Sequence, residues 1–155
     1  MDRQTAERAL PIALLQLNRL YRHAIDRTLA PLGLSDARAL PLLYMARDAD
    51  GLRQGVLADA LGMEGPSLVR LLDHLCFTGL VERRVDPKDA RAKTVHLTAA
   101  GRKAAAECLL LLDEVRKRLL AEVSDADLSV TMKVLAMFQA KLEAARAGEH
   151  GLDPS

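Results

Sequence analysis

Two short amphipathic segments joined at one glycine constrain the fold of this chain more than any other feature. They cover residues 53–61 and 62–75, and Gly62 makes the junction. Two helices joined this tightly need a small residue where they cross and a glycine four positions later for the turn. Ala58 and Gly62 meet this requirement, and every inward position is apolar: Leu57, Leu61, Met63, Leu68 and Leu71. The sequence therefore predicts a helix-turn-helix.

The second of these helices carries an unusual polar stripe. Ser67, Arg70 and His74 are spaced so that they share one side of the helix, away from the leucines. A helix of this kind enters the major groove of DNA N-terminus first, which brings Pro66, Ser67 and Arg70 closest to the bases. A guanidinium can donate to guanine O6 and N7 together, so we expect Arg70 to read a base and His74 to touch the backbone. The alternative for Arg70 is an arginine that is solvated or paired within the chain.

A predicted β-hairpin follows, and it lies in a locally basic segment of the sequence. Residues 78–85 and 93–98 are the only β-like segments, and a polar turn separates them. The net charge is only +1, but residues 83–103 hold seven basic and two acidic side chains, hence +5, which leaves −4 elsewhere. A basic hairpin after a helix-turn-helix indicates contacts with DNA phosphates and a minor groove. Its candidate contacts are Arg83, Arg84, Lys88, Arg91 and Lys93.

Four further helices are predicted, and they make the fold mainly α with a small β-hairpin. They cover residues 10–30, 36–49, 99–123 and 125–147, with Ser35, Thr98 and the Ser124–Asp127 pair as N-terminal caps. We expect residues 1–155 to form a single domain. Within it, residues 35–98 would form the DNA-binding lobe, and residues 1–34 and 99–148 a helical dimerisation region.

Apolar side chains in the terminal helices favour a homodimer. Four consecutive leucines at 109–112 are more than one face of a helix in a monomer can bury. The terminal helices add Leu10, Leu14, Leu128, Met132, Leu135 and Phe138. A two-fold interface built from both chain ends would cover them. The competing interpretation is a helix buried on all sides within one subunit, for which a chain of this size has little material.

Several classes of function find no support in the sequence. No apolar stretch approaches the 18 residues of a membrane span and no signal-peptide core is present, so we expect a cytoplasmic protein without membrane contact. Cys76 and Cys108 fit no metal or disulfide spacing and are interpreted as small buried side chains. No Ser/His/Asp grouping, P-loop or dinucleotide-binding glycine pattern occurs. We therefore expect no catalytic residues, no metal and no cofactor.

The central segment resembles a known family. "LADALGMEGPSLVRLLDHLCFTGLVERRVDPKDARAKTVHLTAAG" is similar to the winged helix-turn-helix core of MarR-type transcriptional regulators, particularly the SlyA branch. The string "PSLVR", the exit L-x-x-x-G-L-V-x-R and the wing pattern D-x-R-x-K of Asp89, Arg91 and Lys93 carry the match. The resemblance implies a homodimer on a pseudo-palindromic operator, base-reading roles for Pro66, Ser67 and Arg70, and minor-groove insertion of Arg91.

The same resemblance implies an effector site, because MarR-type regulators often lose DNA affinity when a small phenolic anion binds. The pocket of the family lies between the first helix, the second helix and the start of the fifth. Its candidate residues in the first helix are Arg19, Tyr21, Arg22 and His23. In the SlyA branch, arginines matching Arg19 and Arg22 hold a carboxylate, but here the second helix has Ala37, Ala39 and Leu43 in place of polar and aromatic residues. These arginines could equally form surface salt bridges.

The sequence thus predicts a dimeric, sequence-specific DNA-binding regulator, a repressor that a small aromatic or phenolic anion relieves. The alternative is a winged-helix module that binds another protein and no DNA. The cationic hairpin and Arg70 argue against that alternative, because a protein-docking module does not need a positive wing.

Overall fold

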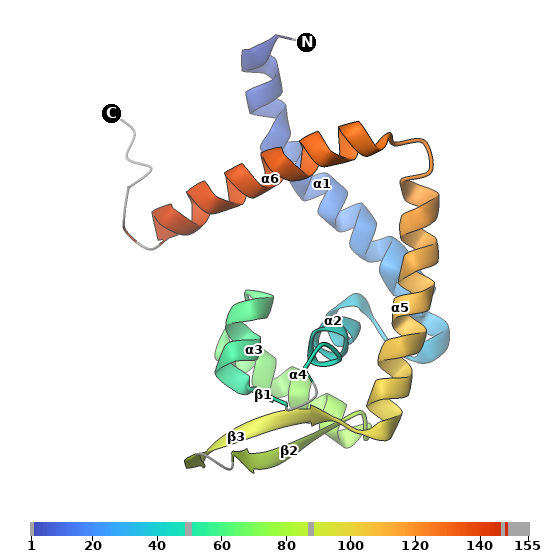
Figure 1. Ribbon diagram of the computed structural model, residues 1–155, viewed down its shortest axis with the longest axis vertical. Helices are drawn as coiled ribbons and strands as arrows, with labels where there is room; N and C mark the ends of the chain where they lie inside the picture. Colours follow the sequence, from blue (N-terminus) through green and yellow to red (C-terminus); the bar gives the residue numbers. More distant parts are fainter. Residues whose placement is uncertain (1, 49–50, 87–88, 147, 149–155) are drawn as a thin grey trace. The chain divides into compact units, whose positions relative to one another are not determined.

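The structure of the chain is a computed structural model that describes residues 2–48, 51–86, 89–146 and 148 (Figure 1). It divides into two compact units, Met1–Val115 and Arg116–Ser155. Its elements are α1 (Arg3–Leu29), a 3-10 turn η1 (Ala30–Leu32), α2 (Asp36–Met45), β1 (Leu52–Arg53), α3 (Gln54–Leu61), α4 (Gly65–Phe77), β2 (Val81–Asp86), β3 (Asp89–Leu97), α5 (Ala99–Leu119) and α6 (Asp125–Arg146). The predicted fold class, mainly helical with a small hairpin, is confirmed.

Short side chains cap three of the helices, two of them as predicted. The backbone N–H of Gly101 donates to Thr98 Oγ1 over 3.0 Å at the start of α5. At the start of α6, Ser124 Oγ accepts from the backbone N–H of Asp127 over 3.1 Å. The helix α1 begins earlier than predicted, because Asp2 caps it by accepting from the Thr5 backbone N–H over 2.9 Å. Pro11 then lies inside α1 and not in its first turn.

The start of α2 differs from the prediction in its chemistry. Ser35 occupies the N-cap position, but its side chain makes no capping hydrogen bond. The carboxylate of Asp26, on α1, accepts instead from the Asp36 backbone N–H over 2.7 Å. An acceptor ten residues earlier in the chain therefore replaces the local cap, and it ties α1 to α2.

The predicted hairpin is part of a three-stranded antiparallel sheet of order β1-β3-β2. In the register of β2 with β3, Val81 lies opposite Leu97 and Arg83 opposite Val95. The strand β1 pairs Leu52 with Val95 on the other edge of β3. This third strand was not predicted, because two residues are too few to show an alternating pattern.

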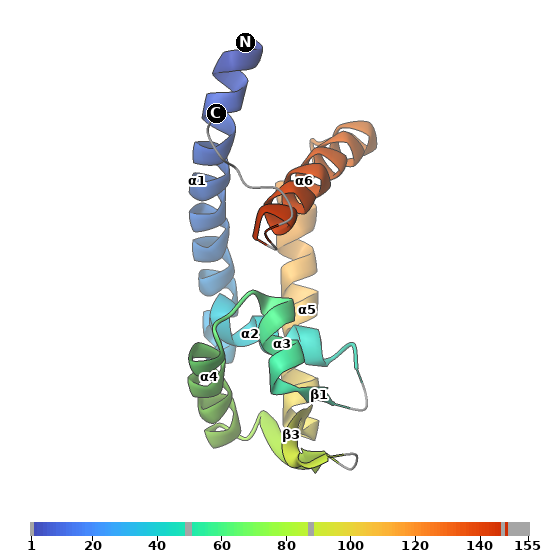
Figure 2. The same cartoon turned by 90° about the vertical axis from the view of Figure 1, so that its left-hand side faces the viewer.

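One apolar core holds the unit of residues 1–115 together. Its buried side chains come from α1 to α5 and from the sheet, and Figures 1 and 2 show α3 and α4 next to the strands. The buried side chains are Ile25, Leu29, Leu34, Ala39, Leu42, Met45, Leu57, Ala58, Leu68, Leu72, Leu75, Val81, Val95, Leu97, Ala105, Cys108 and Leu112. The core fixes α4 against the sheet, and it leaves the opposite side of α4 in solvent.

The start of α5 approaches the residue before β2, Leu80, closely at a glycine. A Cβ on Gly101 would lie 1.9 Å from the backbone carbonyl oxygen of Leu80. The same carbonyl accepts from the backbone N–H of Thr98 over 3.1 Å, so it cannot move away without losing that bond. A side chain at position 101 would therefore have to displace this carbonyl.

We predict that Gly101→Ala lowers the free energy of unfolding by about 1–3 kcal/mol, the usual cost of overpacking. Gly55→Ala is the matched control, because Gly55 lies in α3 and a Cβ added there would meet no atom within 4 Å. That control should leave stability unchanged or slightly raised. Urea unfolding at one fixed protein concentration measures both. Equal stability of the two variants would mean that the approach at Gly101 is looser than described.

Candidate nucleic-acid interface

The turn between α3 and α4 has the geometry that the sequence predicts. Gly62 adopts the left-handed conformation with φ 62°, which favours glycine. Its backbone N–H donates to the carbonyl of Asp59 over 3.2 Å, and that of Met63 donates to the carbonyl of Ala58 over 2.9 Å. Leu57, Ala58 and Leu68 are buried, while Leu61, Met63 and Leu71 pack partly buried against them. The helix-turn-helix is therefore present with its predicted inward residues.

The solvent side of α4 carries all three predicted base-reading residues. Pro66, Ser67 and Arg70 are exposed, whereas His74 is half-buried. Within the part of the chain that the structure describes, Arg70 makes no ion pair or hydrogen bond. Its guanidinium is thus available for a ligand outside the chain.

Two further side chains on this side of α4 were not singled out from the sequence. Val69 is 41% exposed, and the side chain of Asp73 is 57% exposed. Pro66, Val69, Arg70 and Asp73 follow the spacing i, i+3, i+4 and i+7, which places them on one helix face. A helical projection centred on the buried leucines, and not on the polar residues, would have found both.

The strand β2 holds α4 through a salt bridge. Arg83 Nη1 lies 2.6 Å from Asp73 Oδ1, and Arg83 Nη2 donates to the carbonyl oxygen of Val69 over 3.5 Å. The Arg83 side chain is only 24% exposed. This arginine was predicted to contact a phosphate, and in the structure its guanidinium is occupied by α4.

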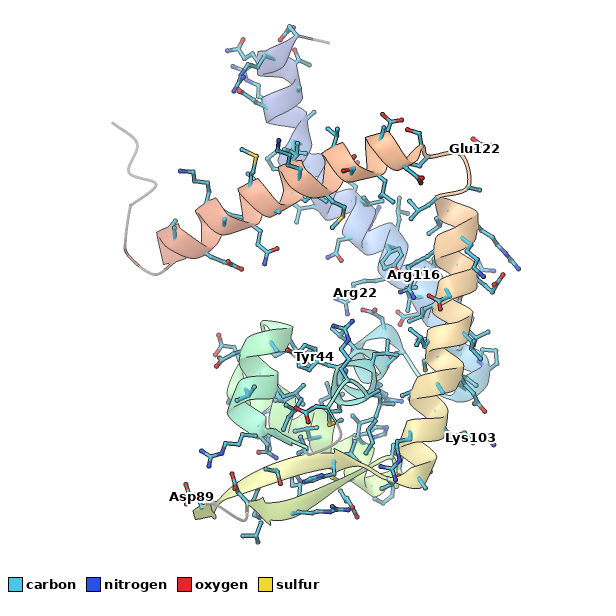
Figure 3. All side chains as sticks on the ribbon, viewed as in Figure 1. Arg22, Tyr44, Asp89, Lys103, Arg116 and Glu122 are labelled. Atoms are coloured by element: carbon cyan, nitrogen blue, oxygen red, sulfur yellow. The ribbon has the colours of Figure 1, made fainter. Side chains whose placement is uncertain are left out.

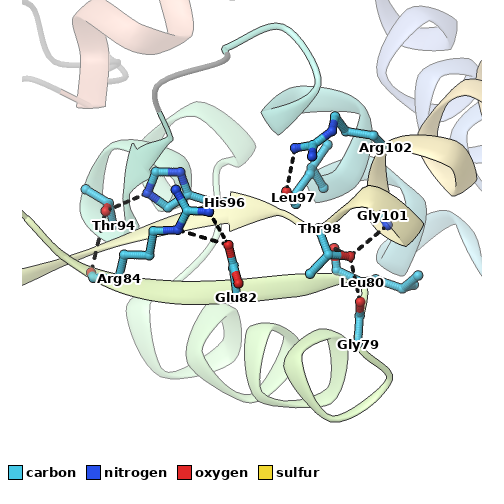
Figure 4. A network of polar contacts seen from close by, with 10 residues as sticks. All are labelled: Gly79, Leu80, Glu82, Arg84, Thr94, His96, Leu97, Thr98, Gly101 and Arg102. Atoms are coloured by element: carbon cyan, nitrogen blue, oxygen red, sulfur yellow. Dashed lines mark hydrogen bonds and ion pairs between the residues drawn. The ribbon is translucent and has the colours of Figure 1, made fainter.

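A second predicted phosphate contact is also paired within the chain. Arg84 donates from Nε to Glu82 Oε1 over 2.9 Å, and its terminal nitrogen binds the same oxygen (Figure 4). On β3, Thr94 Oγ1 lies 2.9 Å from His96 Nε2. Glu82 and His96 lie directly opposite each other in the two strands. The positive charge counted from the sequence is therefore partly compensated at the base of the hairpin.

Another ion pair joins the hairpin to the start of α3. Arg53 Nε donates to Asp86 Oδ2 over 2.7 Å, and the Asp86 side chain is only 7% exposed. Lys93 is exposed on β3, and Figure 3 marks Asp89 at the far end of the hairpin. The predicted contact Lys88 lies outside the described residues, as does the side chain of Arg91, although the backbone of Arg91 belongs to β3.

The predicted effector residues of α1 do not share one environment. Arg22 Nε lies 3.0 Å from Asp36 Oδ2 at the start of α2, so the salt-bridge alternative holds for this residue. Arg19 and His23 are exposed, and Tyr21 packs half-buried against the core. The structure thus joins Arg22 to α2 and leaves the other two polar side chains in solvent.

Both cysteines are free, and they differ in environment. Burial raises the pKa of the Cys108 thiol, and the neighbouring Glu107 carboxylate adds to this effect. Cys76 is half-buried near the end of α4. Among the described residues, no group of three metal-ligating side chains could hold an ion. No helix in the same residues has the length and apolarity needed to cross a bilayer.

Comparisons with known proteins agree with this geometry. The model of the MarR family matches residues 32–92. The transcriptional regulator PA3341 is 38% identical over 86% of this chain and 98% of its own, with a TM-score of 0.79. S. aureus MepR, in a complex with DNA, is 25% identical over 84% of this chain and 96% of its own, with a TM-score of 0.80. A mutant MarR from E. coli complexed with operator DNA has the same fold, with a TM-score of 0.77, 23% identity and coverage of 89% and 99%.

The helix-turn-helix, the three-stranded sheet and these matches define a winged-helix DNA-binding fold. The chain belongs to the MarR family of transcriptional regulators.

We predict that Arg83 and Asp73 are coupled energetically. In a double-mutant cycle of Arg83→Gln and Asp73→Asn, the coupling should stabilise the fold by about 0.5 kcal/mol, because Asp73 is largely solvated. The coupling should fall as salt is raised from low to molar concentration. Urea unfolding of the four proteins measures it. A coupling of zero at low salt would show that Arg83 does not hold α4.

Proposed function

We propose that this MarR-family regulator binds a pseudo-palindromic DNA operator as a homodimer and represses transcription. The observation that carries the proposal is the state of Arg70: it is exposed on the outward face of α4 and unpaired among the described residues, while Arg83 and Arg84 on β2 are paired. A bidentate contact of Arg70 with guanine supplies selectivity. Structures of S. aureus MepR in complex with DNA and of a mutant E. coli MarR with operator DNA support DNA binding by this fold.

The remaining predicted contacts are assigned by groove. Pro66 and Ser67 reach base edges beside Arg70, and His74 touches the backbone. Arg91 enters the minor groove, and phosphate contacts come from the other four hairpin cations: Arg83, Arg84, Lys88 and Lys93. Arg84 exchanges its carboxylate partner for a phosphate when it contacts DNA, whereas Arg83 keeps its ion pair with Asp73 and contacts a phosphate through the N–H groups that this pair leaves free.

Exposed apolar surface supports the homodimer. On α1, Ile12, Leu15, Leu17 and Leu20 are 59–73% exposed. On α6, Val130, Met132 and Met137 are 58–63% exposed. Surface of this kind is costly in water and is covered in stable dimers. We therefore keep residues 1–34 and 99–148 as the dimerisation region and residues 35–98 as the DNA-binding lobe, with two α4 helices on half-sites about 34 Å apart.

A small aromatic or phenolic anion is the proposed effector, bound by Arg19, Tyr21, Arg22 and His23. The ion pair of Arg22 with Asp36 supports competition between Asp36 and a ligand for the Arg22 guanidinium, because a ligand carboxylate must displace Asp36 to reach it. The displacement alters the contact of α1 with α2 and so the position of the lobe. Membership of the SlyA-like branch and a cytoplasmic location belong to the same proposal.

We predict that Arg70→Ala removes about 1–3 kcal/mol of preference for the operator and leaves non-specific binding nearly unchanged. Fluorescence anisotropy over a salt series measures the affinity of the full chain for a duplex from its own upstream region and for a scrambled duplex. Arg27→Ala, an exposed arginine of α1, is the matched control and should behave as the wild type.

Two outcomes would contradict this assignment. Equal losses of affinity on both duplexes would remove base reading from Arg70. No preference of the wild-type protein, with a shallow salt dependence on both duplexes, would favour the winged-helix module that binds another protein.

We predict that Leu15→Glu weakens the dimer by about 2 kcal/mol or more, because a carboxylate would be buried without a partner. Leu15 is 73% exposed in the single chain. The control Val56→Glu changes a residue of α3 that is 51% exposed and outside the proposed interface. Sedimentation equilibrium gives the dissociation constants. A monomeric wild type at micromolar concentration would overturn the proposed dimer.

A further inference from the structure

The face of α4 that points to solvent carries two apolar side chains that the core does not use: Val69 in its N-terminal half and Phe77, 90% exposed, at its C-terminal end. In the N-terminal half, which leads into the major groove under the proposed function, the exposed aliphatic side chain is Val69. Val69 is 41% exposed, and its neighbours on the same face are Pro66, Arg70 and Asp73. The apolar requirement of the core is already met on the opposite face by Leu68, Leu72 and Leu75, which are at most 1% exposed. Packing of the core therefore does not explain a valine at this position.

The side chain of Val69 is held in a defined direction. Valine in a helix has one strongly preferred χ1 rotamer, so its two methyl groups point to fixed places. The backbone of the same turn is held from the sheet, because Arg83 donates to the Val69 carbonyl over 3.5 Å and binds Asp73 over 2.6 Å. A contact made by Val69 loses little conformational entropy on binding.

Asp73, the acidic residue on this face, is already bound. A free carboxylate here could accept from the amino group of cytosine. The Asp73 carboxylate instead holds Arg83, and the pair presents no net charge. Of Val69 and the neighbours named above, Arg70 therefore remains available for a hydrogen bond to a base, and Val69 for an apolar contact.

We propose that Val69 is a specificity-determining residue that recognises the 5-methyl group of a thymine in each half-site. The inference rests on the proposed function, in which α4 lies in the major groove. Among the four natural bases, the only apolar group that the major-groove edge presents is this methyl group. A valine cannot hydrogen-bond, so it discriminates bases only through such a contact. Arg70 then selects a guanine and Val69 selects a thymine near it.

The test removes each partner of the contact separately. A duplex is first selected from a randomised library by the full-length wild-type protein. Each thymine of one half-site, with its symmetric counterpart, is then replaced by deoxyuridine, which lacks only the methyl group. Anisotropy gives the affinities of the wild type, of Val69→Ala and of the control Val56→Ala. Val56 is a comparably exposed valine on α3, at 51% against 41%.

For one thymine pair, removal of the methyl groups should lower the affinity of the wild type about fourfold per half-site. This factor corresponds to the free energy of burying one methyl group. Val69→Ala should bind the thymine duplex more weakly and respond to that deoxyuridine less than twofold. Val56→Ala should respond as the wild type does. Alanine favours helix at an exposed site, so the variant keeps its fold, and its retained non-specific DNA binding verifies this.

The outcomes separate this inference from the proposed function. If a sequence is selected but no deoxyuridine effect depends on residue 69, only the role of Val69 is overturned. If Val56→Ala loses the same deoxyuridine effect, the role of Val69 is overturned as well. If the selection enriches no sequence, the proposed function fails and the inference fails with it.

Discussion

The packing of α4 against the core is the constraint on which the rest of the structure depends. Leu68, Leu72 and Leu75 fill the inward face of this helix and are fully enclosed. Burial of three leucines stabilises the fold by several kcal/mol, roughly 1.5–3 each relative to exposure. Because this face is fixed, the opposite face is presented in one orientation only. Apart from Asp73, which pairs with Arg83, its side chains can differ at little cost to the fold.

Features that depend on local chemistry could be predicted from the sequence. The turn at Gly62 and the caps at Thr98 and Ser124 involve residues at most five positions apart, so their spacing is sufficient. Features that depend on partners far away in the sequence could not be predicted from it. The strand β1 exists because β3 offers it an edge, and Ser35 makes no capping bond because Asp26 reaches the same helix start from α1.

The candidate site shows the same division. Helical periodicity was enough to place Arg70 outward, because only the direction of the core is needed for that. The pairing of Arg83 with Asp73 depends on how closely β2 approaches α4, which no pattern in either segment indicates. Counting charges therefore overstated the free positive charge of the hairpin, since two of its arginines lie against carboxylates.

The ion pair of Arg83 on β2 with Asp73 on α4 has a consequence for the spacing of contacts on DNA under the proposed mode of binding. Arg83 links α4, which is assigned to the major groove, to β2, the first strand of the hairpin that is assigned to the minor groove. Because the shared core also packs α4 against the sheet, helix and hairpin of one lobe move together, and the number of base pairs between their two contacts is constant. An inserted base pair between these contacts cannot be absorbed by a shift of either element alone, so each half-site is recognised at one fixed length.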